Sequence, residues 1–153
     1  MKNLGTISIV GGESLIGREL RDLMAAQHLP VRINLLGLDE GALTLTEQDG
    51  GPAIITPLDG ENLLGSQIVF LAGSTSSSRK ALGMAAKPAA GPVLIDLTYS
   101  AEDEPSARLR APAVEPAAYA APAGRLHVIA HPAAIALAVA RPLLPAPVSG
   151  EAE

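Results

Sequence analysis

The stretch "SIVGGESLIGREL" combines residue types and spacing that are typical of phosphate binding. Gly11, Gly12 and Gly17 lie between a β-rich apolar run and a segment with helical periodicity. A pyrophosphate-binding turn uses glycine for tightness, for close approach of the backbone to the ligand, and for helix–strand packing. The helix that follows adds N–H groups and the positive end of its dipole. The pattern predicts a dinucleotide site formed by Gly11, Gly12, Ser14, Leu15, Ile16 and Gly17.

Position 14 departs from the dinucleotide fingerprint, because Ser14 stands where the middle glycine belongs. Its hydroxyl could cap the helix or donate to a phosphate, while its Cβ narrows the approach of a ligand. Glu13 adds a negative charge near the expected phosphates. These departures predict weak binding of NAD or NADP. The alternative is a strand-to-helix turn that only retains its glycines.

Asp39 follows the second β-rich run, where an acid can accept a hydrogen bond from a ribose 2′-hydroxyl. The same charge would repel a 2′-phosphate, so Asp39 favours NAD over NADP. The alternative is a solvated acid in the turn "LDEG".

A run of five hydroxyl residues, 74–78, follows another apolar run that ends at Gly73. Capping of a helix needs only one hydroxyl. We therefore expect a loop that faces a ligand, with Gly73, Ser74 and Thr75 as further cofactor-binding residues. Plain helix capping is the alternative.

The stretch "HVIAHPAAIALAVARPLLP" reads as a strand, a sharp turn and a helix, which is a common way to present a nucleophile. The first residues after this turn are Ala133 and Ala134, which have no reactive group. The chain contains no cysteine, so it supplies no thiol nucleophile or thiolate ligand. His131 is expected to cap the end of the strand, and a remnant ligand contact is the alternative. His28 and His127 are isolated in the sequence, and no metal site is expected.

Charge and hydropathy exclude several classes of partner. The net charge is −5, and the eleven Lys and Arg residues are scattered rather than clustered. This pattern predicts that neither nucleic acid nor an anionic membrane is a partner. The longest apolar run falls short of the ~18 residues that span a bilayer. We expect a soluble, cytoplasmic protein.

Apolar β-rich runs alternate with segments of helical periodicity along the chain. The expected strands are 6–10, 31–38, 67–73, 92–97 and 127–130, with a hairpin of 42–45 and 53–56 around "EQDGG". Helices are expected after the strands at 6–10, 67–73 and 127–130, and residues 98–125 are expected to form a long loop with one helical turn at 115–120. This alternation predicts an α/β fold, Rossmann-like and doubly wound, with a mainly parallel sheet. We expect one domain, 1–145, and a flexible tail, 146–153.

Six segments occur in an order that resembles the N-terminal cofactor-binding domain of the aspartate-semialdehyde dehydrogenases. They are "ISIVGGESLIGREL", "HLPVRINLLGL", "GSQIVFLAGSTSSSRKAL", "PVLIDLTYS", "APAVEPAAY" and "VIAHPAAIALAVARPLLP". The resemblance implies a domain that binds NADP(H), within an enzyme that reduces an acyl phosphate to an aldehyde through a cysteine thioester.

The departures from that family concentrate in its chemistry. Ala134 stands at the position of the nucleophilic cysteine, and "AED" at 101–103 lacks the family's substrate-binding arginine. The second domain, which carries the catalytic histidine, has no counterpart in this sequence. The resemblance therefore implies a degenerate or excised dinucleotide-binding domain, a pseudoenzyme without reductase activity on its own.

The alternative is a non-enzymatic assembly module that keeps the Rossmann-like fold. The segment 133–144 is apolar on most faces, and such a helix is normally buried. Without a second domain or a partner protein to cover it, we expect a homo-oligomer, a dimer.

Overall fold

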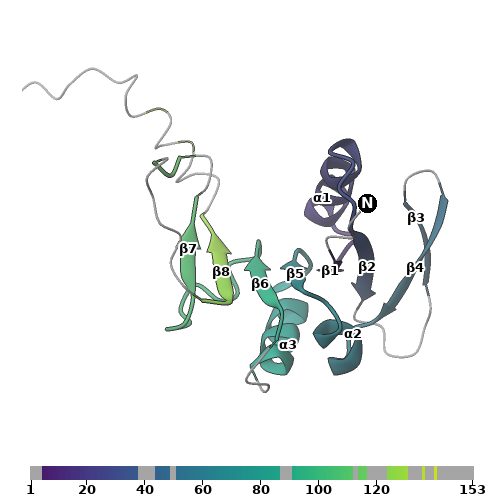
Figure 1. Cartoon of the computed structure of the whole chain (residues 1–153). Helices are drawn as coiled ribbons and strands as arrows, with labels where there is room; N and C mark the ends of the chain where they lie inside the picture. The colour runs from purple at the N-terminus through teal and green to yellow at the C-terminus, as the bar shows by residue number, and fades with distance from the viewer. Residues whose placement is uncertain are drawn as a thin grey trace, which may run out of the picture.

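A computed structural model describes residues 5–37, 44–48, 51–86, 91–111, 114–116 and 124–130, together with Ala136 and Ala140. Its strands form a single sheet that is shown in Figure 1. The strands are β1 (Thr6–Val10), β2 (Arg32–Gly37), β3 (Thr44–Gln48), β4 (Gly51–Pro57), β5 (Ile68–Leu71), β6 (Val93–Asp96), β7 (Arg108–Arg110) and β8 (Leu126–Ile129). The helices are α1 (Leu15–Ala26), α2 (Gly60–Leu64) and α3 (Thr75–Ala85).

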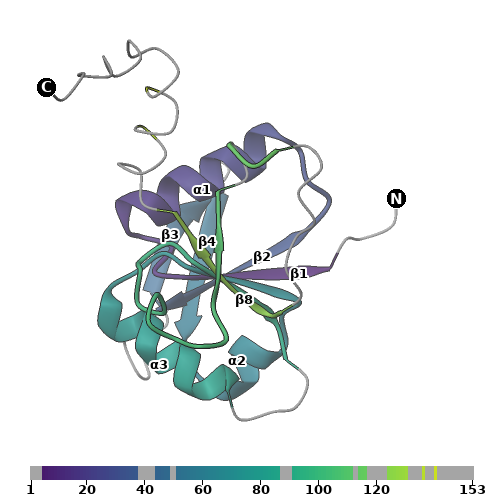
Figure 2. The same ribbon diagram turned by 90° about the vertical axis from the view of Figure 1, so that its left-hand side faces the viewer.

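The strand order is β3-β4-β2-β1-β5-β6-β8-β7, and every neighbouring pair is parallel except β3 and β4. Helix α1 lies on one face of the sheet, and α2 and α3 lie on the other (Figure 2). Right-handed crossovers explain this division, since the connections β1–α1–β2 and β5–α3–β6 run outward from the centre in opposite directions. The predicted doubly wound, mainly parallel α/β fold is confirmed.

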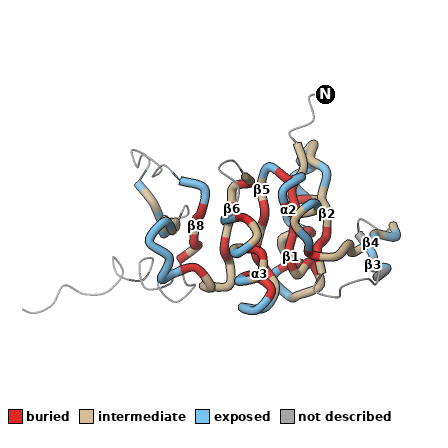
Figure 3. Tube along the Cα trace, turned by 90° about the horizontal axis from the view of Figure 1, so that it is seen from below, coloured by how far each residue is buried: buried red, intermediate tan, exposed pale blue. Residues whose placement is uncertain are grey.

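Two apolar layers flank the sheet, because alternate residues of each strand point to opposite faces. On the α2 and α3 side, Val10, Leu71, Leu94 and Val128 pack with Ala81 of α3. The other layer joins residues of β1 and β2 to Met24 of α1. Figure 3 shows that buried residues concentrate in the central strands and become sparse in the β3–β4 hairpin.

Each described helix begins at a side-chain cap. Ser14, Asp59 and Ser74 accept hydrogen bonds from the N–H groups of Gly17, Asn62 and Ser77, respectively. Such caps satisfy donors that the first helical turn leaves without a carbonyl partner. None of the helices in the described part has the length and apolar character that crossing a membrane requires.

Two elements differ from the sequence-based expectation. Helix α2 is only five residues long, so it has too few turns to show a periodic pattern. Strand β7 lies within the expected loop 98–125, and its sequence "RLR" has no β-typical pattern. Its pairing with β8 is a tertiary contact that the local sequence does not specify. The helical turn expected at 115–120 falls mostly outside the described residues.

Candidate functional site

The carboxyl ends of β1 and β5 lie side by side at the centre of the sheet, where Val10 pairs with Leu71. The chain winds away from this point in both directions, through β2 on one side and β6 on the other. In open α/β sheets, ligands bind in the crevice at such a reversal. The turns that follow Val10 and Leu71 therefore form the candidate site.

Gly11 and Gly17 have the structural roles that the sequence predicts for them. Gly11 adopts a φ of +80°, a conformation that L side chains rarely adopt, and a Cβ there would overlap the Cα of Gly73. A Cβ on Gly17 would overlap the carbonyl oxygen of Gly11. These glycines let the two turns and helix α1 pack closely. The contacts are internal, so they support a preformed turn rather than a particular ligand.

The Ser14 side chain is engaged within the protein. Its Oγ accepts a hydrogen bond from the N–H of Gly17 at 2.9 Å and donates to the carbonyl of Ala72 at 2.5 Å. Of the two roles open to Ser14, the structure therefore shows capping. The Ser14–Ala72 bond connects the turn after β1 to the turn after β5.

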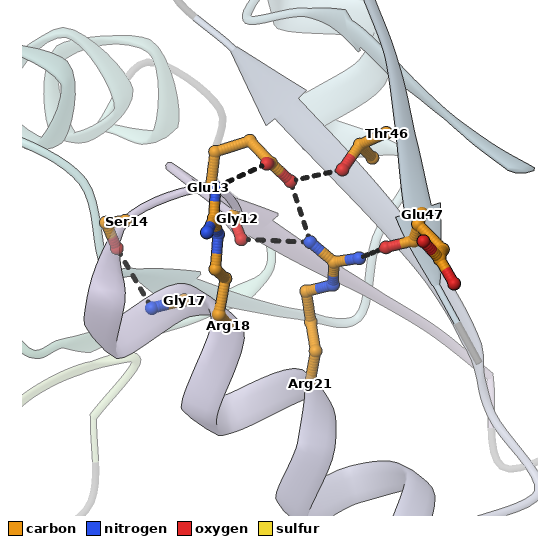
Figure 4. Close-up of polar contacts among 8 residues, drawn as sticks. All are labelled: Gly12, Glu13, Ser14, Gly17, Arg18, Arg21, Thr46 and Glu47. Carbon is orange, nitrogen blue, oxygen red and sulfur yellow. Dashed lines mark hydrogen bonds and ion pairs between the residues drawn. The ribbon is translucent and has the colours of Figure 1, made fainter. Parts of the chain in front are cut away.

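Glu13 points away from Ser14 and toward α1 and β3 (Figure 4). Its carboxylate accepts hydrogen bonds from Arg21 Nη1 and from Thr46 Oγ1, both at 2.7 Å, and from Arg18 Nη2 at 3.2 Å. Burial raises the pKa of Glu13, but the hydrogen bonds from Thr46 and Arg21 and the charges of both arginines outweigh it, and the pKa falls below its ordinary value. The negative charge expected beside the phosphates is thus paired with two cations.

Arg21 connects the glycine-rich turn to the β3–β4 hairpin through hydrogen bonds. Its side chain is only 8% exposed and also donates to the carbonyl of Gly12 at 3.1 Å and to the carbonyl of Glu47. Sequence reasoning missed this residue, because an arginine on an amphipathic helix is usually solvated. The carbonyl of Glu47 that it contacts lies in the distant hairpin, so no local pattern distinguished Arg21 from a solvated arginine.

The first turns of α1 and α3 both open at the carboxyl edge of the sheet. Helix geometry leaves the N–H groups of Leu15 and Ile16 in α1, and of Thr75 and Ser76 in α3, without carbonyl partners inside their helices. Leu15 and Ile16 are 84% and 44% exposed, so the first turn of α1 lies at the surface of the protein. A dinucleotide pyrophosphate fits such paired helix ends.

The hydroxyl run at 74–78 divides into two parts. Ser74, Thr75 and Ser76 are exposed at the start of α3. Ser77 and Ser78 are 3% and 0% exposed, with Ser77 bonded to Ser74 and Ser78 bonded to Thr98. The expected ligand-facing loop therefore extends no further than Ser76, because helix periodicity turns Ser77 and Ser78 inward. The proposed binding roles of Gly73, Ser74 and Thr75 stay predictions.

The turn after β6 holds a polar network that sequence reasoning did not identify. Asp96 is fully buried and accepts hydrogen bonds from the N–H and Oγ1 of Thr98 and from the N–H of Ala101. Between them, Tyr99 has a φ of +59°, which is uncommon for a residue with a side chain. Burial and the charges of Asp96 and Glu102 raise the pKa of Tyr99. The run "DLTYS" was the signal, since an acid and three hydroxyls follow a buried strand.

Asp39, His131, Ala133 and Ala134 lie outside the described residues, so their predicted places in the site stay predictions. Among the residues that are described, no three His, Cys, Asp or Glu side chains come together as metal ligands do.

No family model matches the sequence, and no curated protein matches it. Solved structures do match. Aspartate semialdehyde dehydrogenase II from Vibrio cholerae, complexed with ASA, has a TM-score of 0.70 at 18% identity over 91% of this chain. A probable aspartate-semialdehyde dehydrogenase from Pseudomonas aeruginosa has a TM-score of 0.67 at 22% identity over 82% of the chain. The enzyme from Francisella tularensis has a TM-score of 0.64 at 11% identity over 86%.

The chain shares the fold of part of the aspartate-semialdehyde dehydrogenases. It spans 46%, 37% and 38% of the length of those three structures, respectively. The resemblance stated from the sequence is therefore confirmed at the level of the fold.

Proposed function

We propose that this chain is a dinucleotide-binding domain of the semialdehyde dehydrogenase type, that it binds NAD(H) weakly, and that it has no reductase activity on its own. One observation carries the proposal: the turns after β1 and β5 touch through Gly11 and Gly73 at the reversal point of the sheet. Two helices begin there, and their first N–H groups can receive a pyrophosphate.

Weak binding follows from Ser14. The two glycines that serve turn and packing are present, whereas the position that admits the phosphates in the fingerprint carries a side chain bonded to the turn after β5. Glu13 contributes less repulsion than its charge alone suggests, because Arg21 and Arg18 pair with it. Asp39 remains the proposed reason for a preference for NAD over NADP.

The absence of reductase activity rests on Ala134, which the resemblance places at the nucleophile position. An NADP-linked assay with aspartate semialdehyde and phosphate should show no turnover. Measurable turnover would show that the catalytic groups have been misjudged.

Leu15→Glu tests whether the α1 N-terminus binds the phosphates. An acid in the first turn of a helix stabilises it, and α1 has none there, so the variant should fold at least as well as the wild type. The new charge should abolish NAD(H) binding in a calorimetric titration. Leu23→Glu is the matched control, because Leu23 is also exposed, at 57%, but lies two turns further along α1.

A second candidate function, assembly through α1, is favoured by the same exposed residues. Leu15, Ile16 and Leu23 share one stripe of α1 and leave an apolar surface facing outward. If this stripe forms a homodimer contact, sedimentation should show a dimer that both Leu15→Glu and Leu23→Glu dissociate. A wild-type protein that is monomeric at all concentrations would exclude assembly through α1. Loss of NAD(H) binding in Leu15→Glu but not in Leu23→Glu would favour the dinucleotide-binding function.

A further inference from the structure

A cavity of about 690 Å³ lies on the α3 side of the sheet, distinct from the turns after β1 and β5. Its walls come from α3, from the beginning of β6, from the loop between β6 and β7, and from the residues that lead into β8. Its size is in the range of small-molecule sites, which are concave, mostly apolar and marked by a few polar groups.

The floor of this cavity is apolar and rigidly placed. Leu94 and Leu126 come from neighbouring parallel strands, are 6% and 9% exposed, and pair directly in the sheet register. Ala85 of α3 is 4% exposed and belongs to the same core cluster. A ligand here would place an apolar body against the hydrophobic core.

The rim is cationic although the chain as a whole carries a net charge of −5. Three arginines, Arg79, Arg108 and Arg125, line the cavity together with two acids, Asp103 and Glu104, so the formal charge of the lining is positive by one. Arg108 donates through Nη1 to the carbonyls of Ala107 at 2.9 Å and Pro105 at 3.3 Å. These two bonds hold its guanidinium in place.

Arg79 and Arg108 form no ion pair with a carboxylate of the described residues. Arg79 lines the cavity from α3 and Arg108 from β7, so two separate elements each contribute an arginine to its wall. Guanidinium N–H groups match the geometry of a carboxylate. A lining with one net positive charge suits a monoanion better than a doubly charged phosphate.

We propose that this cavity binds a small organic monocarboxylate with an apolar body, its carboxylate between Arg79 and Arg108 and its body over Leu94 and Leu126. The site lies on the α3 face of the sheet and does not depend on the dinucleotide proposal. Ser100 adds a fixed polar wall, because its hydroxyl is bonded at 2.7 Å to Thr98, which is anchored to the buried Asp96.

The probe is 2-naphthoate, a monocarboxylate with a rigid apolar body, titrated calorimetrically into the folded chain. We expect saturable binding, and much weaker binding of the neutral 2-naphthamide and of the dianion 2-naphthyl phosphate. Arg79→Gln and Arg108→Gln should each weaken 2-naphthoate binding by about tenfold or more, as expected for a charge-assisted hydrogen bond. Arg32→Gln is the control, since Arg32 is exposed on β2 and does not line the cavity.

Gly83→Leu tests whether 2-naphthoate binds in this cavity, without removing a charge. Gly83 lines the cavity, and a Cβ there meets no atom within 4 Å, so the side chain can enter open space. Replacing glycine inside a helix also favours folding. We expect this variant to remain folded and to lose 2-naphthoate binding. Binding that is absent in the wild type, equal for the amide or the phosphate, or unchanged by Arg79→Gln and Gly83→Leu would overturn the proposal.

Discussion

The hydroxyl of Ser14 donates to the carbonyl of Ala72 at 2.5 Å and thereby joins the turn after β1 to the turn after β5. The same oxygen caps α1 by accepting from Gly17. Both contacts stabilise the arrangement of the two turns. In the proposed dinucleotide site, the Ser14 side chain would also stand where a pyrophosphate approaches the backbone, so it would strengthen the turn at the expense of ligand access.

Replacing Gly11 should destabilise the fold more than most turn substitutions. Gly11→Ala combines a strained φ of +80° with an overlap on the Cα of Gly73. We expect a loss of about 2 kcal/mol or more in the free energy of unfolding. Urea unfolding followed by circular dichroism measures it. The matched control, Gly83→Ala, should instead raise stability by about 0.5–1 kcal/mol, since its site is helical and open. Equal effects at the two sites would contradict this account.

Arg21 should matter far more to stability than Arg18. Arg21→Met leaves the carbonyls of Gly12 and Glu47 without this donor and removes the more buried partner of Glu13. We expect a loss of about 2 kcal/mol. Arg18→Met removes a partner that is 64% exposed and should change stability by less than about 0.5 kcal/mol. Denaturant unfolding of both variants measures the two losses in the free energy of unfolding. A loss in Arg18→Met as large as that in Arg21→Met would contradict the larger structural role of Arg21.

The Glu13 network should weaken in acid. The pKa of Glu13 is lower in the folded chain than its ordinary value of 4.5, so the folded state favours the charged carboxylate. Its stabilising contribution is present above pH 4.5 and is lost as the pH falls through the folded-state pKa. Because the side chain is 38% exposed, we expect less than about 1 kcal/mol. The unfolding free energies of the wild type and Glu13→Gln should therefore differ at pH 7 and converge as the pH falls below 4.5 and through the folded-state pKa. A difference in unfolding free energy that does not change with pH would contradict the proposed contribution of ionised Glu13.

The fold could largely be predicted because the local sequence patterns of its strands and helices match the way these elements pack. Parallel strands that are covered on both faces, such as Thr6–Val10, are mostly apolar, and helix caps such as Ser14 and Ser74 have distinctive residue types. The hairpin of β3 and β4 carries its turn signal in "EQDGG". Strand β7 could not be predicted, because its place is decided by the edge of β8 rather than by its own sequence.

The site was only partly predictable for a similar reason. The glycine pattern of the first turn can be recognised locally, although the close packing of Gly11 against Gly73 joins two turns that are far apart in the sequence. The pairing of Glu13 with Arg21 and Thr46 depends on a hairpin more than thirty residues away in sequence, so no local pattern reports it. The burial of Ser77 and Ser78 depends on which face of α3 meets the core.

The central claim is that the turns after β1 and β5 form a dinucleotide site that Ser14 narrows. The most direct test is a calorimetric titration with NAD(H) of two proteins, the wild type and Ser14→Gly. Glycine at an N-cap costs only a few tenths of a kcal/mol relative to serine, so the variant should fold. It removes the side chain that bridges to Ala72 and restores the middle glycine of the fingerprint. We predict weak binding by the wild type and binding at least several-fold tighter by Ser14→Gly. Binding that is absent in both folded proteins, or no tighter in Ser14→Gly, would contradict the claim.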